Sequence, residues 1–349
     1  MTAQSIKILQ VIDTLDVGGA EKVFVDMCNI LYENQQDVTA LFLLSGGVLQ
    51  KNMRVEIPFL ELGRTNKWSL KFMFQCYLIL KKFDIVHCHS SHVYRYIRLI
   101  SRLFLLKRTK IIFQDHHGIV AVNKKVPLFF NSILKPEFYI GVSTLLVEWS
   151  IGAMKIRKDH SFLLENIIIK EKTKEKTDKP KAYDLLLVSN IKENKNQLFA
   201  LQLAEKLQLS LLLVGKVQDV KYHAVLSDAI TSKNIKFETG CDEVQSLLGE
   251  AKLGLHTSLY ETGPLVLIEY LAQGLPFLAY ETGEVSKILK PYFPEYFIAN
   301  FDSNQWSERI LMLLSKKADT AKMQEVFEQH FGKEPYFKKL IAIYQCIKT

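Results

Sequence analysis

The amino-acid sequence predicts an α/β protein with two tandem domains, each built on a doubly wound parallel sheet. Its 349 residues suggest two domains, at a prior of roughly 150 residues per domain. Short β-branched apolar runs alternate with stretches of about 12 to 15 residues whose apolar side chains recur at helical spacing. Residues 170–181 interrupt this pattern, because none of them has an apolar side chain. Such a segment cannot join a core, and we interpret it as the linker between two domains.

The first domain is expected over residues 1–169. The helix after its first strand has one apolar face, formed by Val23, Phe24, Met27, Ile30 and Leu31. Because the apolar runs are nearly continuous, they predict a parallel sheet that is covered on both faces. The strands are expected at residues 7–13, 38–44, 84–89, 110–115 and 138–143.

The same pattern restarts after a charged linker at 170–182, and it predicts a second domain over 183–330. Its strands are expected at residues 184–190, 209–215, 234–237, 252–256 and 276–280. The last segment, 331–349, is expected to be helical and has no strand after it, so it could pack back on the first domain. Ligands bind to doubly wound sheets at the carboxyl ends of the strands, and the expected active site is a cleft between two such ends.

The composition excludes several classes of protein. With 48% hydrophobic residues, the chain is not disordered, and no apolar run reaches the roughly 18 residues that a membrane-spanning helix needs. The amino end does not resemble an export signal. An odd number of scattered cysteines without a C-x-x-C pair argues against a disulfide framework or a structural zinc site, so we expect a reducing cytoplasm. The five cysteines are Cys28, Cys76, Cys88, Cys241 and Cys346.

The most informative segment spans residues 258–283 and reads SLYETGPLVLIEYLAQGLPFLAYETG. Glu261 follows a predicted strand, and the residues 262–264, Thr-Gly-Pro, open the next helix. Glycine allows close approach of the backbone there, and proline suits the first helical turn. The unpaired amides of that turn can hold an anion such as a diphosphate. Glu269, further along the helix, could bind a vicinal diol while Glu261 contacts another part of the ligand, although two solvated glutamates would show the same spacing.

This segment resembles a conserved block of the retaining glycosyltransferases of glycosyltransferase family 4, which have the GT-B fold of two facing Rossmann-like domains. The resemblance covers nearly the whole chain. The residues that match the block, in order, are Ser258, Glu261, Gly263, Pro264, Glu269, Ala272, Gly274, Pro276 and Ala279. The resemblance implies that Glu261 contacts the donor sugar and that Glu269 contacts the nucleotide ribose. It also implies that the diphosphate is bound by amides near Thr262, from Gly263 to Leu265.

Three further matches lie where that family would require them. Gly18 and Gly19 open the first helix as the glycine-rich loop of the family does, although a tight turn alone would also need glycine. His117, after the strand at 110–115, matches the family's His-Gly pair, whose imidazole bonds the transferred sugar. Lys195 matches the lysine of the G-R-x-x-x-x-K motif, which neutralises the diphosphate. That charge matters because negative charge builds on the leaving nucleotide as the glycosidic bond breaks.

The match has departures. Asn190 stands where the family normally has an arginine, so one positive charge toward the diphosphate is missing, and Lys192 or Lys216 could replace it. Asn190 and Gly215 complete the expected donor site. The family's Asn-Gly turn is present only as Asn166 followed by isoleucine, and its aspartate before the Glu-loop strand is replaced by lysine.

The resemblance implies a retaining glycosyltransferase that moves a sugar from a nucleotide-sugar donor to a hydroxyl of a glycan or lipid-linked acceptor, as in polysaccharide or glycolipid synthesis. No Asp-x-Asp metal motif is present, so we expect neither a metal nor a cofactor. Two alternatives remain open. A GT-B shell could bind ligand without turnover, and His87, His89 and His92 are spaced like part of a metallo-hydrolase signature, with Ser91 where that signature has aspartate.

The positive charge of the chain, +8 overall, is concentrated in residues 51–110. Within that region a helix around Tyr94, Ile97, Ile100 and Leu103 has an apolar face beside basic residues, namely Arg95, Arg98 and Arg102. This pattern predicts either a helix that lies on an anionic membrane surface or an ordinary sheet-covering helix with a solvated basic face. No nucleic-acid motif accompanies the charge, so we expect no nucleic-acid partner. The protein is therefore expected in the cytoplasm, peripheral on the inner face of the membrane if that helix binds lipid.

Overall fold

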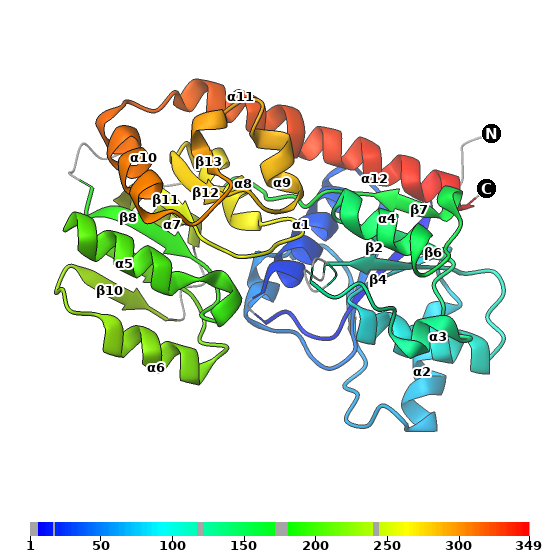
Figure 1. The fold of residues 1–349 in the computed structure, drawn as a ribbon. Coiled ribbons are helices and arrows are strands. Elements are labelled where there is room, and N and C mark those ends of the chain that lie inside the picture. Colours follow the sequence, from blue (N-terminus) through cyan, green and yellow to red (C-terminus); the bar gives the residue numbers. More distant parts are fainter. Residues whose placement is uncertain are drawn as a thin grey trace. The chain divides into compact units, whose positions relative to one another are not determined.

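The computed structural model consists of two compact units. The first unit comprises residues 1–168 together with 333–349, and the second comprises residues 169–332 (Figure 1). The structure describes residues 6–16, 18–116, 120, 122–171, 181–239 and 244–348. Each unit has one parallel sheet with helices on both faces, as the sequence predicts.

The sheet of the first unit has seven strands in the order β3-β2-β1-β4-β5-β6-β7, and all neighbouring strands are parallel. The strands are β1 (Lys7–Ile12), β2 (Asp37–Phe42), β3 (Phe59–Glu61), β4 (Ile85–His89), β5 (Lys110–Asp115), β6 (Phe138–Gly141) and β7 (Ser161–Leu163). The strand order reverses between β1 and β4. In such sheets the carboxyl ends of the two strands at the reversal form the usual ligand site.

Two sets of helices cover this sheet. The helices are α1 (Gly19–Glu33), α2 (Leu70–Leu80), α3 (Ser91–Leu103), α4 (Thr144–Gly152) and α12 (Lys333–Lys348). Short 3₁₀ segments lie at η1 (Val48–Asn52), η3 (Leu128–Asn131) and η4 (Lys158–His160). Helices α2, α3 and α4 share one apolar core, in which Met73, Tyr94 and Leu146 are buried against the sheet.

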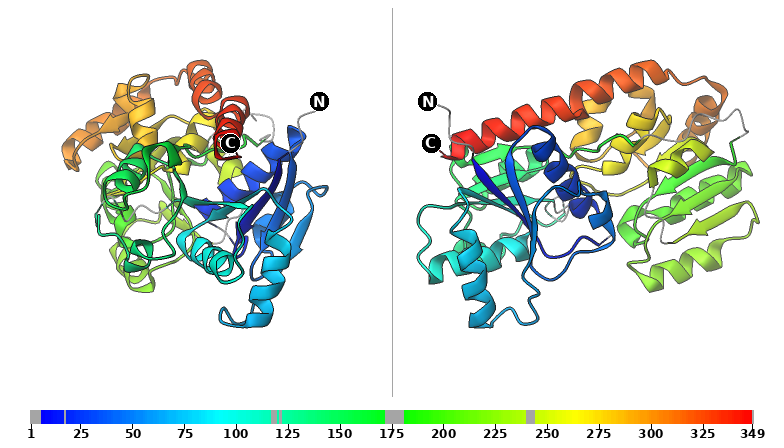
Figure 2. Two further views of the ribbon diagram at one scale, coloured as in Figure 1. Left: turned by 90° about the vertical axis from the view of Figure 1, so that its right-hand side faces the viewer. Right: turned by 180° about the vertical axis from the view of Figure 1, so that it is seen from behind.

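Helix α12, at the carboxyl end of the chain, belongs to the first unit and packs beside α1 (Figure 2). Its buried face includes Leu340, Ile343 and Tyr344, whose spacing is that of one helical face. Lys333 at its start forms an ion pair with Glu33 at the end of α1, at 2.7 Å. The chain therefore returns to its first unit after completing the second.

Helix α3 is the amphipathic basic helix for which the sequence left two predictions open. Its apolar face was expected either to lie on a membrane or to cover the sheet. The prediction that its apolar face lies on a bilayer is wrong, because Tyr94, Ile97 and Ile100 are completely buried. The guanidinium of Arg98 is also buried and faces Glu137 at 3.8 Å. Leu103, by contrast, is half exposed. Helix α3 is a sheet-covering helix, and its apolar stripe serves the core.

The second unit has a six-stranded sheet in the order β10-β9-β8-β11-β12-β13, again with parallel neighbours. Its strands are β8 (Tyr183–Val188), β9 (Leu211–Val214), β10 (Ile235–Glu238), β11 (Ala251–His256), β12 (Phe277–Tyr280) and β13 (Phe297–Ile298). The order reverses between β8 and β11. Because crossovers between parallel strands are right-handed, helices that follow β8 and helices that follow β11 cover opposite faces of the sheet.

The helices of the second unit are α5 (Gln197–Leu207), α6 (Val220–Ala229), α7 (Val244–Leu247), α8 (Leu265–Gln273), α9 (Gly283–Leu289), α10 (Ser303–Ser315) and α11 (Thr320–Phe331). Three 3₁₀ segments accompany them, η5 (Glu193–Lys195), η6 (Leu248–Glu250) and η7 (Pro294–Tyr296).

One close contact fixes α8 on the sheet. The ring of Tyr270 lies against Gly254 of β11, where even a Cβ atom would come within 2.6 Å of the ring. The hydroxyl of Tyr270 donates to the carbonyl of Leu186 and accepts the amide of Val188, each at 3.3 Å. This buried tyrosine ties α8 to the two central strands, so the first turn of the helix is held beyond the end of β11.

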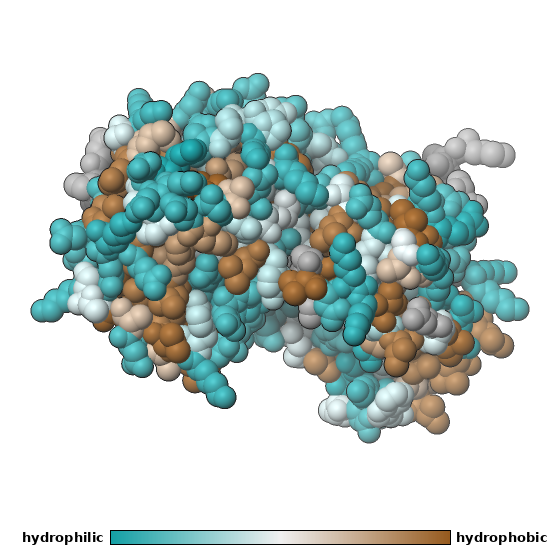
Figure 3. All heavy atoms as spheres, viewed as in Figure 1, coloured by the Kyte–Doolittle hydropathy of each residue, from teal (hydrophilic) through white to brown (hydrophobic). Residues whose placement is uncertain are grey.

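Among the described residues, no helix is both long and apolar enough to cross a bilayer. Hydrophobic surface is nevertheless present, and Figure 3 shows it gathered over the part of the first unit that carries α2 and α3.

Candidate functional site

The candidate site lies in the second unit, at the carboxyl ends of β8 and β11, where the strand order reverses. Two loops form its floor: the loop after β8 leads to η5, and the loop after β11 leads to α8. Hydrogen bonds join them, because the hydroxyl of Thr257 donates to the carbonyls of Lys195 at 2.9 Å and Asn196 at 3.0 Å. The amide of Leu259 donates to the carbonyl of Asn194 at 2.9 Å.

The structure brings together Lys195 and Glu261, the two residues of this unit that are predicted to be catalytic. Their side chains form a direct ion pair, and both are mostly buried. The amide of Glu261 donates to the hydroxyl of Thr282 at 3.1 Å, which links the Glu261 loop to the end of β12. An oppositely charged pair is therefore held at the topological reversal by three strand ends.

Electrostatics keep Glu261 ionised. Burial on its own would raise the pKa of this carboxyl, but the Lys195 ammonium and the nearby His256 imidazole outweigh burial and lower the pKa to about 2. The carboxylate consequently stays charged at neutral pH, as an acceptor of hydrogen bonds.

His256, the last residue of β11, is a member of the site that sequence reasoning missed. Its side chain is buried, its Nε2 lies 3.8 Å from Oε1 of Glu261, and neither ring nitrogen has a hydrogen-bond partner among the described residues. Burial lowers the pKa of this imidazole and outweighs the opposing effect of Glu261. Nothing in the sequence distinguishes it from any histidine at a strand end, because its importance depends on the neighbouring loop.

The predicted diphosphate-binding turn is present. Helix α8 begins at Leu265 with Pro264 as its N-cap, and proline has no side-chain oxygen to cap the first amides. Thr262 is buried, and its carbonyl accepts the amide of Glu284 at 2.7 Å. Gly263 lies between them. The start of α8 is thus positioned by backbone contacts.

A glycine of the next loop allows this arrangement. Gly283 has a φ of +80°, and a Cβ there would lie 2.9 Å from Cδ of Pro264 and 3.3 Å from Cβ of Glu261. Any larger residue would press on the turn that carries Glu261. Glu269 lies in α8 and is buried, in agreement with its predicted place on that helix.

The loops after β8 and β9 hold the other predicted donor-site residues. The carbonyl of Asn190 accepts a hydrogen bond from Nε2 of Gln197 at 2.9 Å. Gly215 has a φ of +154°, and a Cβ there would lie 1.9 Å from the carbonyl oxygen of Ser189, so only glycine fits. The amide of Ile191 then donates to the carbonyl of Lys216 at 2.8 Å, which joins the two loops.

The two lysines that could replace the missing arginine differ in environment. The side chain of Lys192 is about half buried, and burial together with the nearby Lys195 ammonium lowers its pKa. Lys216 is exposed. Of the two lysines, Lys192 is therefore the one that interacts electrostatically with the Lys195–Glu261 pair.

The predicted residues of the first unit lie at its own reversal, after β1. Gly18 is the extended N-cap residue of α1, and Gly19 is the first residue of that helix. A Cβ on Gly18 would come within 2.2 Å of the carboxylate of Glu21, whose pKa burial raises. His117 and Gly118 lie outside the described residues.

The histidines of the metallo-hydrolase alternative have other partners. His87 and His89 are buried in β4, where Nδ1 of His87 lies 2.7 Å from the Tyr344 hydroxyl and Nε2 of His89 lies 2.9 Å from Oε1 of Gln10. His92 lies on the surface, 2.8 Å from Asp13. Among the described residues, no three His, Cys, Asp or Glu side chains are placed to share a metal ion.

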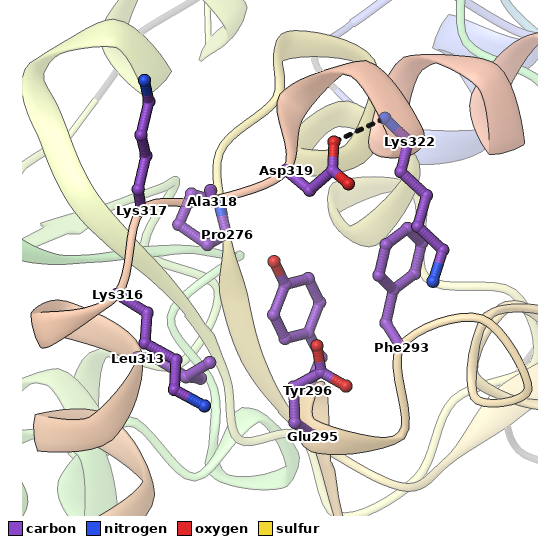
Figure 4. A pocket seen from close by; sticks show the side chains of 10 residues that line it. All are labelled: Pro276, Phe293, Glu295, Tyr296, Leu313, Lys316, Lys317, Ala318, Asp319 and Lys322. Carbon is purple, nitrogen blue, oxygen red and sulfur yellow. Dashed lines mark hydrogen bonds between the residues drawn. The ribbon is translucent and has the colours of Figure 1, made fainter.

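A separate pocket of the second unit, of about 240 Å³, is drawn in Figure 4. It is lined by Pro276, which precedes β12, and by residues of η7 and of the connection between α10 and α11. Pro276 marks the amino end of its strand, so the pocket lies at the edge of the sheet opposite the candidate site. Ligands of parallel α/β sheets bind at the carboxyl ends instead.

Two parallel α/β units, with a site at the carboxyl ends of the strands, define the GT-B class of glycosyltransferase folds. Solved structures show the same fold. HepE of Anabaena, in complex with UDP and glucose, aligns over 97% of this chain and 99% of its own, with a TM-score of 0.79 and 15% identity. A glycosyltransferase from Rickettsia africae aligns over 98% of both chains, with a TM-score of 0.77 and 19% identity. A variant of S. aureus TarM, in complex with Fondaparinux, alpha-GlcNAc-glycerol and UDP, aligns over 97% of this chain and 99% of its own, with a TM-score of 0.75 and 12% identity.

Family models agree with the fold. Residues 169–330 match the model of the group 1 glycosyl transferases. Residues 17–142 match the model named glycosyltransferase family 4. A search of curated proteins found no match to the chain. The chain therefore combines two glycosyltransferase domains in one GT-B fold.

Proposed function

We propose that the protein is a retaining glycosyltransferase that moves a sugar from a nucleotide-sugar donor to a hydroxyl of a glycan or lipid-linked acceptor. The observation that carries this proposal is the Lys195–Glu261 ion pair beside the uncapped start of α8. A cation and a helix N-terminus attract a diphosphate, and an ionised carboxylate accepts hydrogen bonds from sugar hydroxyls. A nucleotide-sugar contains both groups, because its diphosphate is joined directly to the sugar.

The ion pair also suggests how the donor is bound. A diphosphate that arrives at the start of α8 competes with Glu261 for the Lys195 ammonium. When Lys195 turns to the phosphate oxygens, Glu261 loses its cation and can accept hydrogen bonds from the donor sugar. His256, 3.8 Å from Glu261, would then be the closest remaining donor to that carboxylate. Binding thus exchanges one internal ion pair for two contacts with substrate.

Departure of the nucleotide needs positive charge, because the diphosphate gains negative charge as the glycosidic bond breaks. We assign this task to Lys195, to the amides of Gly263 and Leu265 on either side of Pro264, and to Lys192 in place of the arginine missing at Asn190. This arrangement would act without a metal ion. Retention of configuration and a part in the synthesis of cell-surface polysaccharide or glycolipid belong to this proposal and rest on the resemblance to family 4. The roles of Gly18, Gly19 and His117 toward donor or acceptor belong to the same proposal.

We place the reaction in the cytoplasm. Cys28, Cys76 and Cys88 are buried free thiols in the structure, and free thiols persist in a reducing compartment.

Calorimetric titration of the full chain with UDP and a panel of UDP-sugars tests the proposal. UDP is the first choice because the structures of HepE and TarM were determined with it. We expect saturable binding that is unchanged by a chelator, followed by donor hydrolysis or transfer that retains the anomeric configuration. A donor present at 100 times its dissociation constant should stabilise the fold by about 2.7 kcal/mol. Tight binding without any turnover would instead support the ligand-binding shell, for which the loss of arginine at Asn190 is the argument.

A further inference from the structure

Helix α2 is apolar around most of its circumference, yet only one side of it meets the core. The helix reads LKFMFQCYLIL, and its buried residues are Met73, Cys76 and Leu80. Leu70 and Phe74, one turn apart, are exposed. A helix that is apolar on both sides normally has a second apolar neighbour. Among the described residues of this unit, apolar side chains pack against one side of α2, and the side with Leu70 and Phe74 is left exposed.

The end of α3 continues this apolar surface. Phe104, the residue after α3, stacks on Tyr77 of α2 with ring centroids 5.1 Å apart and lies 5.8 Å from Phe74. Beside it, Leu103 and Leu105 are exposed, Leu105 to 74%. We define the α2–α3 surface as Trp68, Leu70, Phe74, Leu103 and Leu105.

Leu105 has a backbone conformation that leucine rarely adopts. Its φ is +51°, in the left-handed region, where a helix end usually has glycine. Leucine there is strained, and its exposed side chain does not compensate for the strain through core contacts.

The two segments that carry the α2–α3 surface, 62–83 and 85–114, contain no acidic residue. Asp84 lies between them and is paired with Lys348 of α12 at 3.5 Å. The exposed cations of these two segments are Lys67, Lys71, Lys81, Lys82, Arg102, Lys107 and Arg108. None of the seven forms an ion pair in the part of the chain that the structure describes. Two of them, Lys67 and Lys81, lie 5.6 Å from the rings of Trp68 and Tyr77.

We propose that the α2–α3 surface docks on an anionic phospholipid bilayer, with its exposed leucines and aromatic rings at the level of the headgroups. The positive charge of the surface, together with its apolar side chains, favours an anionic bilayer over the other possible partners. Unpaired cations attract anionic lipids, tryptophan favours the membrane interface, and apolar side chains enter the acyl boundary. A second copy would bring the same seven cations against each other. Nucleic acid would use the cations but leave the exposed leucines in water.

Trp68 gives a direct spectroscopic test in the unmodified full chain. It is 67% exposed, whereas the other two tryptophans, Trp149 and Trp306, are 7% and 0% exposed. Vesicles of phosphatidylcholine with phosphatidylglycerol should shift the emission to shorter wavelength, and brominated lipid should quench it. Phosphatidylcholine vesicles alone should do neither. Trp68→Phe should abolish the shift without changing the emission of the buried pair. An unchanged spectrum with anionic vesicles overturns the proposal.

Vesicle flotation separates the apolar and the electrostatic contributions. The double variants Leu70→Ser with Phe74→Ser and Leu103→Ser with Leu105→Ser should each lower the partition coefficient at least about tenfold. Lys107→Gln and Arg108→Gln should each lower it about fivefold, and added salt should weaken binding. All of these side chains are exposed, so far-UV circular dichroism should be unchanged.

Exposed apolar residues elsewhere serve as matched controls. Val55 is 92% exposed in the first unit, and Val220 and Leu311 are exposed in the second. Their replacement by serine should leave flotation unchanged. Equal losses in these controls, equal binding to neutral vesicles, or a dimer in sedimentation velocity that the α2–α3 variants dissociate would each overturn the proposal. Vesicle binding is measured without donor, so this result is independent of the proposed transfer reaction.

Discussion

The two units share a topology but differ in the chemistry of their strand reversals. In the second unit, the reversal between β8 and β11 holds charged groups, Lys195 and Glu261, with a buried imidazole beside them. In the first unit, β1 and β4 hold a buried neutral network, in which Gln10 and His87 are cross-strand neighbours. Charged groups are present beyond the end of β1, where Asp13 pairs with Arg64 at 3.2 Å, but they are not part of this network. We call the Lys195–Glu261 group of the second unit the charged edge and the Gln10 network of the first unit the neutral edge.

The neutral network extends from the last helix to the end of β5. Nε2 of Gln10 donates to the hydroxyl of Tyr344 in α12 at 2.7 Å, which leaves the phenol proton for Nδ1 of His87. Oε1 of Gln10 accepts from Nε2 of His89, whose Nδ1 then accepts from Nε2 of His116 at 3.4 Å. The fixed amide of Gln10 thus sets the tautomers of the histidines. His116 directly precedes the predicted catalytic residue of this unit.

The charged edge should be the more sensitive to substitution in activity. Lys195→Ala should lower the rate of sugar transfer by about 10³-fold or more, because the leaving diphosphate loses its principal side-chain cation. Glu261→Gln should cause a loss of similar size while preserving the shape of the side chain. Steady-state kinetics of transfer would measure both.

Lys216→Ala is the matched control, since it removes an exposed lysine from the neighbouring loop. Its kinetics should be close to those of the wild type. Near-normal turnover in Lys195→Ala or Glu261→Gln would contradict the role assigned to that residue.

The neutral edge should be the more sensitive in stability. Tyr344→Phe removes the hydroxyl that pairs with both Gln10 and His87, and it leaves their buried polar atoms unsatisfied. We expect the free energy of unfolding to fall by about 1–3 kcal/mol, measured by denaturant titration.

Tyr336→Phe provides the comparison on the same helix. The hydroxyl of Tyr336 is buried without a hydrogen-bond partner among the described residues, so its removal should cost little or stabilise the fold. Equal losses in the two variants would mean that the polar network contributes nothing beyond packing.

Acid should separate the two edges as well. Burial lowers the pKa of His87 to about 3 and lowers that of His89 well below its usual value. Between about pH 6.5 and pH 3 the unfolded chain therefore binds protons that the folded unit does not, and stability falls as the pH falls. Each such histidine contributes a slope of about 1.4 kcal/mol per pH unit. Glu261 contributes its full stabilisation only above the ordinary carboxyl pKa of 4.5, and this contribution is lost as the pH falls from 4.5 to its folded pKa of about 2.

His87→Gln should reduce the dependence of unfolding free energy on pH by about 1.4 kcal/mol per pH unit over that range, which corresponds to one proton. Denaturant titrations at several pH values would measure the slope. The variant has its own cost at neutral pH, so the comparison is of slopes and not of absolute stabilities. An unchanged slope would show that His87 is protonated in the folded state.

The sequence predicted the strands of the central sheets because buried parallel strands are continuous apolar runs. The run at 110–115 corresponds to β5 without any shift, and the run at 7–13 extends one residue past β1. The edge strands β3, β7 and β13 were missed, since they have only two or three residues each. The apolar face of α3 could be read as a core face or as a membrane face, because periodicity indicates an amphipathic helix without identifying what covers it.

The candidate site shows the same limit. Glu261 and the start of α8 belong to one continuous segment, and the sequence pattern was sufficient to indicate them. The contact of Lys195 with Glu261 joins residues that are far apart in the chain, and it was inferred only through resemblance. His256 and the Gln10–Tyr344 contact had no sequence signal, because burial and loop pairing create them.

The smallest expected effect concerns the charge missing at Asn190. Lys192 is half buried, and burial and the nearby Lys195 ammonium lower its pKa. Both effects disfavour the charged form of Lys192, and an incoming diphosphate would stabilise that charge. Lys192→Gln should therefore weaken donor binding about tenfold, which corresponds to about 1.4 kcal/mol, whereas Lys216→Gln should leave it unchanged. Calorimetric titration with UDP would measure both. If Lys216→Gln weakens binding and Lys192→Gln does not, the replacement charge comes from the loop after β9. If neither changes it, the second unit binds the diphosphate with Lys195 and the α8 amides alone.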